Sequence, residues 1–198
     1  ADRSGTITSM VVRQGIAQVS VGDEVEEGQV LVSGRVPIIG DNYYYLYCLW
    51  VSGSYKGKGY GKELLQSCID DAKAQGKSGI CLLSSKKKKP FLSEKKFMLK
   101  YGFKVVDTIN DEYELLALSF DGTQPQFTSN VRKQSIEGKE LTIYYGVQCP
   151  YIPNCIEQIY NYCENNQIPL RLVEIDTLEK AKQLPCIFNN WAVFYNGK

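Results

Sequence analysis

The chain has 198 residues, enough for one large or two small domains, and 43% of them are hydrophobic, so buried cores are expected. A net charge of +1 gives no global argument for binding nucleic acid or a membrane surface, and no apolar run reaches the roughly 18 residues of a membrane-spanning helix. The chain has no histidine, which excludes histidine-based triads, general bases and metal ligands. Seven irregularly spaced cysteines and the lack of a signal-peptide pattern favour a reducing, cytoplasmic setting. We therefore expect no metal site, no nucleic-acid partner and no membrane partner.

Residues 1–40 differ from the rest of the chain, because apolar and polar side chains alternate there with the two-residue period of strands. The stretch from Val21 to Leu31 resembles half of a biotinyl/lipoyl-type hammerhead, and a similar segment occurs in sporulation membrane proteins of the YqfD type. The lysine that such carrier domains modify is missing, since the first lysine of the chain is Lys56. The segment is therefore predicted to be a small β-hairpin with a packing or docking role.

A predicted strand, a glycine-rich turn and a predicted helix follow one another between Tyr43 and Gly76. The apolar, aromatic run over residues 43–51 is typical of a buried strand, and residues 62–74 carry the apolar stripe of an amphipathic helix that Gly76 would end. Glycines at every second position let several backbone N–H groups point at one spot where a helix begins, which is how proteins bind phosphate. The glycines are Gly57, Gly59 and Gly61, and the lysines between and beside them are Lys56, Lys58 and Lys62.

The spacing of these glycines excludes two common phosphate loops. They run as G-x-G-x-G rather than as the dinucleotide fingerprint G-x-G-x-x-G, and no Lys-Ser or Lys-Thr follows as in a Walker loop. The run from Lys56 to Gly61 instead resembles the R/Q-x-x-G-x-G/A signature of the GNAT N-acetyltransferases, with Lys56 where that family usually has Arg or Gln. The likeness is closest to the YoaP-like acetyltransferases and extends from about Tyr43 to the C-terminus. A glycine-rich turn with solvated lysines is the alternative interpretation.

The resemblance implies a fold, a donor and a reaction. The fold class is α/β (α+β), with a GNAT-like mixed sheet and helices over residues 41–120. The co-substrate is acetyl-CoA, whose pyrophosphate the loop amides hold and whose pantetheine arm pairs with the preceding strand. A small-molecule or peptide amine would attack the thioester directly, without an acyl-enzyme. The cofactor-binding residues implied are Leu49, Trp50, Val51, Lys56, Gly57, Lys58, Gly59, Tyr60, Gly61 and Lys62.

The resemblance assigns no catalytic acid. Many GNAT enzymes use a tyrosine four residues before a Gly-Phe pair to protonate the departing thiolate, and that position here is Met98. Tyr101 lies roughly 300° around the predicted helix over residues 90–101, whose N-cap is expected at Ser93. Transfer would depend on water or another acid, on proximity and on a strand amide that stabilises the oxyanion. Cys48 and Cys81 are predicted to be packing residues.

Lysines are concentrated in one part of the chain. Residues 56–104 contain thirteen lysines and four acidic residues, and therefore carry a charge of about +9, with an uninterrupted run at 86–89. Such a density would attract a polyphosphate ligand, while a solvated lysine loop explains the same residues equally well. An RNA-binding patch is less favoured, because the nearby aromatic residues fit core positions.

The C-terminal part resembles a partial thioredoxin or glutaredoxin domain, from its order of strand, cysteine-bearing loop, helix and strand. Strands are predicted at 141–145, 170–175 and 191–198, and a helix at 156–165. Cys149 precedes that helix, whose N-terminus would lower a thiol pKa, and Cys155 follows in a C-x5-C rather than a C-x-x-C arrangement. A thiol redox protein and a catalytically silent CoA-binding module are therefore alternative functions. The predicted division is a hairpin segment at 1–40, the GNAT-like core at 41–120, a linker at 121–140 and the thioredoxin-like part at 141–198.

Overall fold

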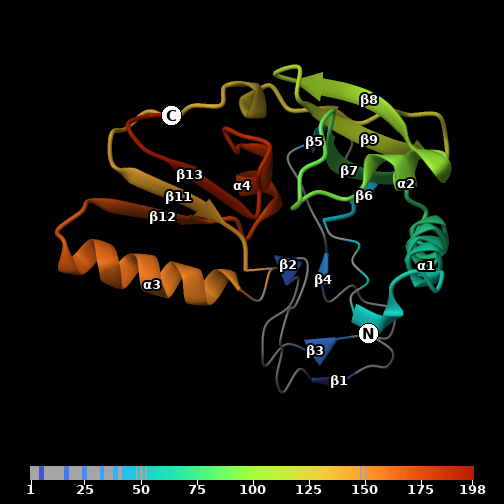
Figure 1. Ribbon diagram of the computed structural model, residues 1–198, viewed down its shortest axis with the longest axis horizontal. Coiled ribbons are helices and arrows are strands. Elements are labelled where there is room, and N and C mark those ends of the chain that lie inside the picture. Colours follow the sequence, from blue (N-terminus) through green and yellow to red (C-terminus); the bar gives the residue numbers. More distant parts are fainter. Residues whose placement is uncertain are drawn as a thin grey trace. The chain divides into compact units, whose positions relative to one another are not determined.

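The computed structural model describes residues 5–6, 16–17, 24–25, 32–33, 38–39, 42–47, 49, 51, 53–147, 149 and 151–198. The chain divides into two compact units, one formed by Ile38–Thr128 and the other by Ala1–Pro37 together with Ser129–Lys198. Helices and sheets alternate in both units (Figure 1), which confirms the predicted mixed α/β class. None of the described helices has the length and hydropathy of a membrane-spanning segment.

The Ile38–Thr128 unit is built on a four-stranded mixed sheet with strand order β6-β7-β9-β8. Its first two strands are parallel, because helix α1 crosses between them, and the other neighbours are antiparallel. The unit also contains the 3-10 turn η1, the short helix α2 and the short strand pair β5 (Ile38–Ile39) and β10 (Gln126–Phe127). The bounds are β6 (Tyr43–Tyr45), η1 (Gly53–Tyr55), α1 (Tyr60–Ala74), β7 (Gly79–Ser85), α2 (Lys95–Lys100), β8 (Lys104–Ile109) and β9 (Tyr113–Ser119).

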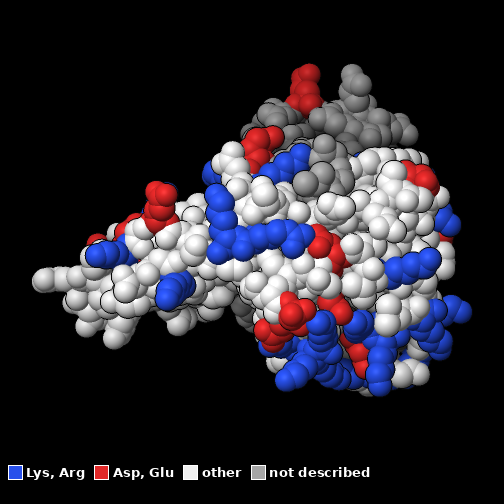
Figure 2. Space-filling model, turned by 90° about the horizontal axis from the view of Figure 1, so that it is seen from above, with Lys and Arg blue, Asp and Glu red and all other residues white. Residues whose placement is uncertain are grey.

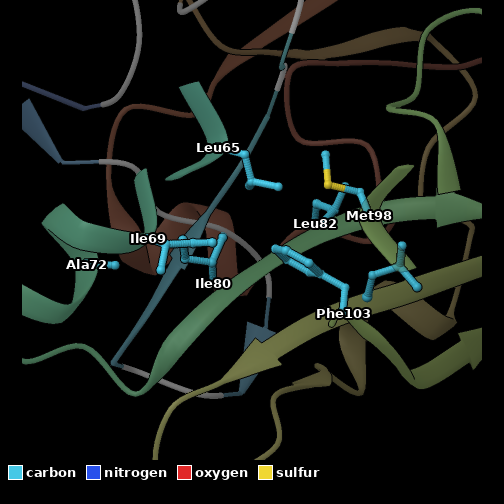
Figure 3. Packing of buried hydrophobic residues seen from close by; sticks show 8 residues of the cluster. Leu65, Ile69, Ala72, Ile80, Leu82, Met98 and Phe103 are labelled. Atoms are coloured by element: carbon cyan, nitrogen blue, oxygen red, sulfur yellow. The ribbon is translucent and has the colours of Figure 1, made fainter. Parts of the chain in front are cut away.

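The core of this unit lies between the sheet and its helices (Figure 3). Helix α1 supplies its apolar side at helical spacing, and β7 supplies alternate residues of one face. The buried members are Leu65, Ile69, Ala72, Ile80, Leu82, Met98, Phe103 and Leu116. The predicted stripe is confirmed except at Leu64, which is 45% exposed because it lies at the edge of the buried face.

Glycines end both helices of this unit in the same way. After α1, Gly76 has φ 63°, and the N–H groups of Gly76 and Lys77 donate to the carbonyls of Lys73 and Ala72. Gly102 ends α2 with the same pair of bonds, and the glycine stop predicted at Gly76 is confirmed. The start of α2 was predicted wrongly. The helix begins at Lys95 after an N-cap at Glu94 rather than at Ser93, and residues 90–92 form a turn instead.

The second unit contains a three-stranded sheet with order β12-β11-β13. Strands β11 and β12 are parallel, with helix α3 between them in sequence, and β13 is antiparallel to β11. The bounds are β11 (Leu141–Tyr145), α3 (Ile152–Asn165), β12 (Leu170–Glu174), α4 (Leu178–Lys182) and β13 (Trp191–Phe194). The three predicted strands are present, but the last ends at Phe194 rather than at residue 198. The helix begins four residues earlier than predicted, with Pro153 in its first turn.

Short strands form the described pieces near the N-terminus. β1 (Gly5–Thr6) pairs with β3 (Glu24–Val25), and β2 (Ile16–Ala17) pairs with β4 (Val32–Ser33), both antiparallel. Apart from residues 38–39, the rest of the predicted hairpin segment lies outside the described residues. β5 (Ile38–Ile39) pairs with β10 (Gln126–Phe127), and η2 (Asn130–Arg132) follows. The segment predicted as a linker therefore contains regular structure, and the division into 1–40, 41–120, 121–140 and 141–198 stays a prediction.

Helix α3 ends on a strained residue, which gives a stability prediction. Gln167 has φ 55°, and the N–H groups of Gln167 and Ile168 donate to the carbonyls of Glu164 and Cys163. This is the position that glycine usually takes. We expect Gln167→Gly to raise the free energy of unfolding by about 1 kcal/mol, since glycine adopts this conformation without the steric cost of a Cβ.

Urea unfolding followed by circular dichroism measures this effect, with Glu157→Gly as the control, because Glu157 is exposed in the interior of the same helix. The control should lower the free energy of unfolding by up to about 1 kcal/mol, because glycine weakens a helix interior. A Gln167→Gly protein as unstable as Glu157→Gly would contradict the assignment of strain to Gln167.

Candidate functional site

The loop before α1 turns on two glycines in the left-handed region. Gly57 has φ 76° and Gly59 has φ 90°, a backbone conformation that side chains oppose. No described heavy atom lies within 4 Å of an ideal Cβ at either position, so the space beside both is open. All residues from Gly53 to Tyr60 are exposed. The loop therefore presents its backbone to whatever molecule occupies that space.

Free backbone donors stand at the start of α1. Gly59 is the N-cap, has no side chain to cap the helix, and accepts from the N–H groups of Lys62 and Glu63 at 2.9 and 3.3 Å. Within the described part of the chain, no group accepts a hydrogen bond from the N–H of Tyr60 or Gly61. The helix macrodipole adds partial positive charge at this end. An anion with several oxygens fits these donors.

The start of α1 lies close to Phe97 and Val51 at Gly61. An ideal Cβ on Gly61 would lie 3.7 Å from Cζ of Phe97 and 4.0 Å from Cγ2 of Val51. Val51 is half-buried, and Leu49 packs against the core cluster. The strand residues predicted to bind a ligand arm thus lead directly to the loop, although Trp50 lies outside the described residues.

Among the described residues, the pairing between the two parallel strands beside α1 stops before β7 ends, and we call the region beyond the last pair the fork. β6 and β7 pair only from Tyr43 opposite Gly79 to Tyr45 opposite Cys81, and the last bond runs from the N–H of Leu46 to the carbonyl of Cys81 at 2.8 Å. β7 continues to Ser85, while no described residue of the β6 side pairs with it beyond this point. The predicted strand over 43–51 is therefore wrong in its length, because β6 ends where the fork opens. A ligand arm with amide groups can pair with such unpaired strand backbone.

Lysines surround the loop and extend beyond it. Lys56, Lys58 and Lys62 are exposed, and Nζ of Lys58 lies 5.8 Å from the ring centre of Tyr55. That ring meets the ring of Tyr60 edge-on with their centres 6.0 Å apart. Figure 2 shows a dense group of basic side chains on one part of the visible face. Lys87 and Lys88 are exposed in the run that follows β7.

Part of the predicted excess charge is neutralised. Lys86 pairs with Asp111 at 3.3 Å, Lys89 pairs with Glu112, and Lys95 pairs with Glu114 at 2.5 Å. All three acids belong to the β8–β9 turn or to β9, outside the segment in which the charge was counted. The local field is therefore weaker than the composition of residues 56–104 implies.

Two residues near the fork are excluded as catalytic groups. Met98 is 1% exposed and packs in the core, so the usual acid position holds no proton donor. Burial raises the pKa of the Cys81 thiol far above its ordinary value, so this cysteine is a packing residue as predicted. Cys48 lies outside the described residues.

The two cysteines of the C-terminal unit flank the start of α3. Cys149 is half-buried and its carbonyl accepts from the N–H of Ile152 at 3.1 Å, while Cys155 is exposed one turn into the helix. Both thiols are free, and the described residues hold no group of three or more metal-ligating side chains. Burial raises the pKa of Cys186 in the same unit to about 11.

Comparisons with known proteins bear on this site. The acetyltransferase (GNAT) family matches residues 15–103, a range that begins within the predicted hairpin segment 1–40, and the YoaP-like family matches residues 169–198. The uncharacterized N-acetyltransferase YoaP of Bacillus subtilis (strain 168) is 39% identical over 165 residues, which cover 82% of this chain and 66% of that relative. The chain thus spans just under two thirds of that relative's length, and no solved structure matches significantly. The chain is thus similar to GNAT acetyltransferases over residues 15–103, to the YoaP-like family over residues 169–198, and along most of its length to a relative named as an N-acetyltransferase.

Proposed function

We propose that the protein is an N-acetyltransferase that transfers an acetyl group from acetyl-CoA to an amine. The observation that carries the proposal is the set of free N–H donors at Tyr60 and Gly61, at the end of the fork between two parallel strands. Phosphate oxygens satisfy such donors, and an amide-bearing arm satisfies the unpaired strand backbone. CoA carries both groups in one molecule. The family match supports the same assignment.

Each part of acetyl-CoA has its own residues in this proposal. The amides from Gly57 to Gly61 bind the pyrophosphate, and the exposed side chains of Lys56, Lys58 and Lys62 add charge around it. The backbone of Leu49, Trp50 and Val51 pairs with the pantetheine arm. Because this arm runs back along the strand from the loop, the thioester lies where the fork opens. The acceptor amine attacks it there directly, since Cys81 is too deeply buried to form an acyl-enzyme.

Two glycines at opposite ends of α1 provide the test. Gly59 and Gly76 both have positive φ and open space at the Cβ position, so alanine imposes similar strain at each. We expect Gly59→Ala to weaken acetyl-CoA binding about tenfold, because the added methyl group stands over the donors and misaligns at least one charge-assisted hydrogen bond. Gly76→Ala should bind as the wild type does.

Calorimetric titration of the three proteins with acetyl-CoA measures the difference, and Gly59→Trp extends it to full blockage of the loop. Equal affinities in the wild type, Gly59→Ala and Gly59→Trp would contradict the proposed site. An affinity lost equally in Gly59→Ala and Gly76→Ala would mean that general strain in α1, and not the loop, governs binding.

Two alternatives predict different results. A catalytically silent module binds acetyl-CoA but releases no free CoA thiol when it is mixed with any member of a panel of amines, peptides and antibiotics. An N-acetyltransferase releases free CoA thiol with at least one of them. A thiol redox protein is favoured by the exposure of Cys155, one turn into α3 and six residues after Cys149, within a β-α-β unit arranged like part of a thioredoxin fold. It requires fast alkylation of Cys149 at neutral pH and a Cys149–Cys155 disulfide on mild oxidation. The cytoplasmic setting also stays a prediction.

A further inference from the structure

The outer edge of β13 carries backbone groups that point away from its sheet. The N–H of Gly146 donates to the carbonyl of Asn190 at 3.0 Å, one position before β13 begins. Bonding residues alternate along an antiparallel pair, so Ala192 faces β11 while Trp191 and Val193 face away from it. The strand order β12-β11-β13 makes β13 an edge strand. The N–H and carbonyl groups of Trp191 and Val193 therefore line an edge of the sheet.

This edge has no partner among the described residues and none of the usual protection. No described group bonds to the outward-facing backbone of Trp191 or Val193. Val193 is 48% exposed and Tyr195 is 67% exposed, and no charged residue occurs from position 183 to position 197. Proteins commonly keep edge strands from pairing with charged side chains, proline or bulges. An exposed edge without charges is instead suited to binding a further strand.

A hairpin turn directly after β13 indicates which strand binds there. The N–H of Tyr195 donates to the carbonyl of Lys198 at 2.8 Å, and the N–H of Lys198 donates back to the carbonyl of Tyr195 at 3.2 Å. Asn196 and Gly197 between them have φ 54° and 81°. Two central residues with positive φ, in the order Asn-Gly, are typical of the type I′ turn that joins two antiparallel strands. Lys198 thus already occupies the position opposite Tyr195 on the free edge.

We propose that the edge of β13 is the docking site of an extended segment joined to Lys198, which pairs antiparallel with β13 as the fourth strand of this sheet. In the register set by the turn, the second residue after Lys198 lies opposite Val193 and the fourth lies opposite Trp191. Each of these pairs exchanges two hydrogen bonds, so all outward-facing backbone groups of β13 gain partners. Apolar side chains at the same two positions cover Val193 and Trp191, because paired residues share one face of a sheet. A strand from a second copy of the chain is disfavoured, since Lys198 already fills the position opposite Tyr195.

Hydrogen exchange of single amides, followed by NMR, tests this proposal. The chain is extended beyond Lys198 by about six residues, the usual length of a strand, which alternate threonine and valine so that valine lies opposite Val193 and Trp191. The control extension has equal length and alternates glycine and serine, a composition that stays flexible. We expect the amides of Trp191 and Val193 to exchange about tenfold more slowly with the threonine–valine extension than with the control, because each gains a hydrogen bond. The amide of Ala192, which faces β11, should exchange alike in both.

Two proline variants test which backbone groups are free. Val193→Pro removes an outward-facing N–H and leaves the bonds to β11 in place, a position where an edge strand accepts proline. Its urea midpoint should stay near that of the parent chain, whereas Ala192→Pro should unfold at clearly lower urea because it removes a donor to β11. With the threonine–valine extension, Val193→Pro should restore fast exchange at Trp191.

The contrary results are equally distinct. Equal exchange of Trp191 and Val193 in the two extended proteins would overturn the proposal, and so would slow exchange of both amides in the unextended monomer. Protection that rises with protein concentration would identify a second copy as the occupant and reject the segment joined to Lys198. A Val193→Pro protein that unfolds as readily as Ala192→Pro would show that the edge at Val193 is not free. None of these results depends on acetyl-CoA, so each leaves the proposed function standing.

Discussion

Gly79→Ala is expected to destabilise the Ile38–Thr128 unit by about 3 kcal/mol or more. Gly79 is the first residue of β7 and is buried between its neighbours. A Cβ there would overlap the carbonyl oxygen of Leu118 and lie 2.5 Å from Cε1 of Tyr43. Moving either atom away would itself destabilise the structure. The first belongs to the backbone of β9, and the Tyr43 ring is held by its hydroxyl, which donates to the carbonyl of Thr123 at 2.6 Å.

Gly61→Ala is the control for this prediction. Its Cβ would meet only ordinary contacts of 3.7 Å or more, and Gly61 lies in the first turn of α1 without a positive φ. Alanine is the better helix former by up to about 1 kcal/mol, so this variant should be at least as stable as the wild type. Urea unfolding curves of the three proteins measure both effects. A Gly79→Ala protein as stable as Gly61→Ala would contradict the packing described around β7.

Lys95→Met is expected to lower the free energy of unfolding by about 3 kcal/mol, which is the second large effect. The Glu114 side chain is only 6% exposed, and Lys95 lies 2.5 Å from its Oε2. Removing the lysine leaves a buried carboxylate without its charged partner, and an unpaired buried charge destabilises a protein more than removal of both charges does. Replacing both residues at once, as Lys95→Met with Glu114→Leu, should recover most of the loss because no charge then remains buried.

Lys86→Met is the matched control, since its partner Asp111 is 99% exposed. Exposed ion pairs contribute little to stability, so the free energy of unfolding of this variant should fall by less than about 1 kcal/mol. A double-mutant cycle from urea unfolding isolates the coupling between Lys95 and Glu114. Equal losses for Lys95→Met and Lys86→Met would contradict the burial of the first pair.

The sequence predicted those features whose causes are local. The stripe of α1 follows from apolar residues at helical spacing, and its end follows from Gly76, which alone adopts the required positive φ without strain. The loop glycines are also recognisable in the sequence, because their spacing fits free amides ahead of a helix. Their role as ligands of acetyl-CoA stays a prediction, as do those of the neighbouring lysines.

Features that depend on distant parts of the chain were not predicted. The aromatic run over 43–51 has no break in composition at Tyr45, so nothing local indicates that β6 ends there; the end is visible only in its pairing with β7. The charge count over 56–104 missed the acids that pair with its lysines, because each pair joins residues at least 19 positions apart. Residue spacing within one segment carries no information about such contacts.

The claim that backbone amides at the start of α1 hold the diphosphate of CoA is tested most directly by NMR with ¹⁵N-labelled glycine. Seventeen glycines give a sparse amide spectrum in which each can be assigned by substitution. On addition of CoA, we expect the largest shifts at Gly57, Gly59 and Gly61, with Gly76 and Gly102 unchanged. A saturating amount of CoA that leaves the three loop glycines unshifted, or that shifts only glycines outside the loop, would contradict the account.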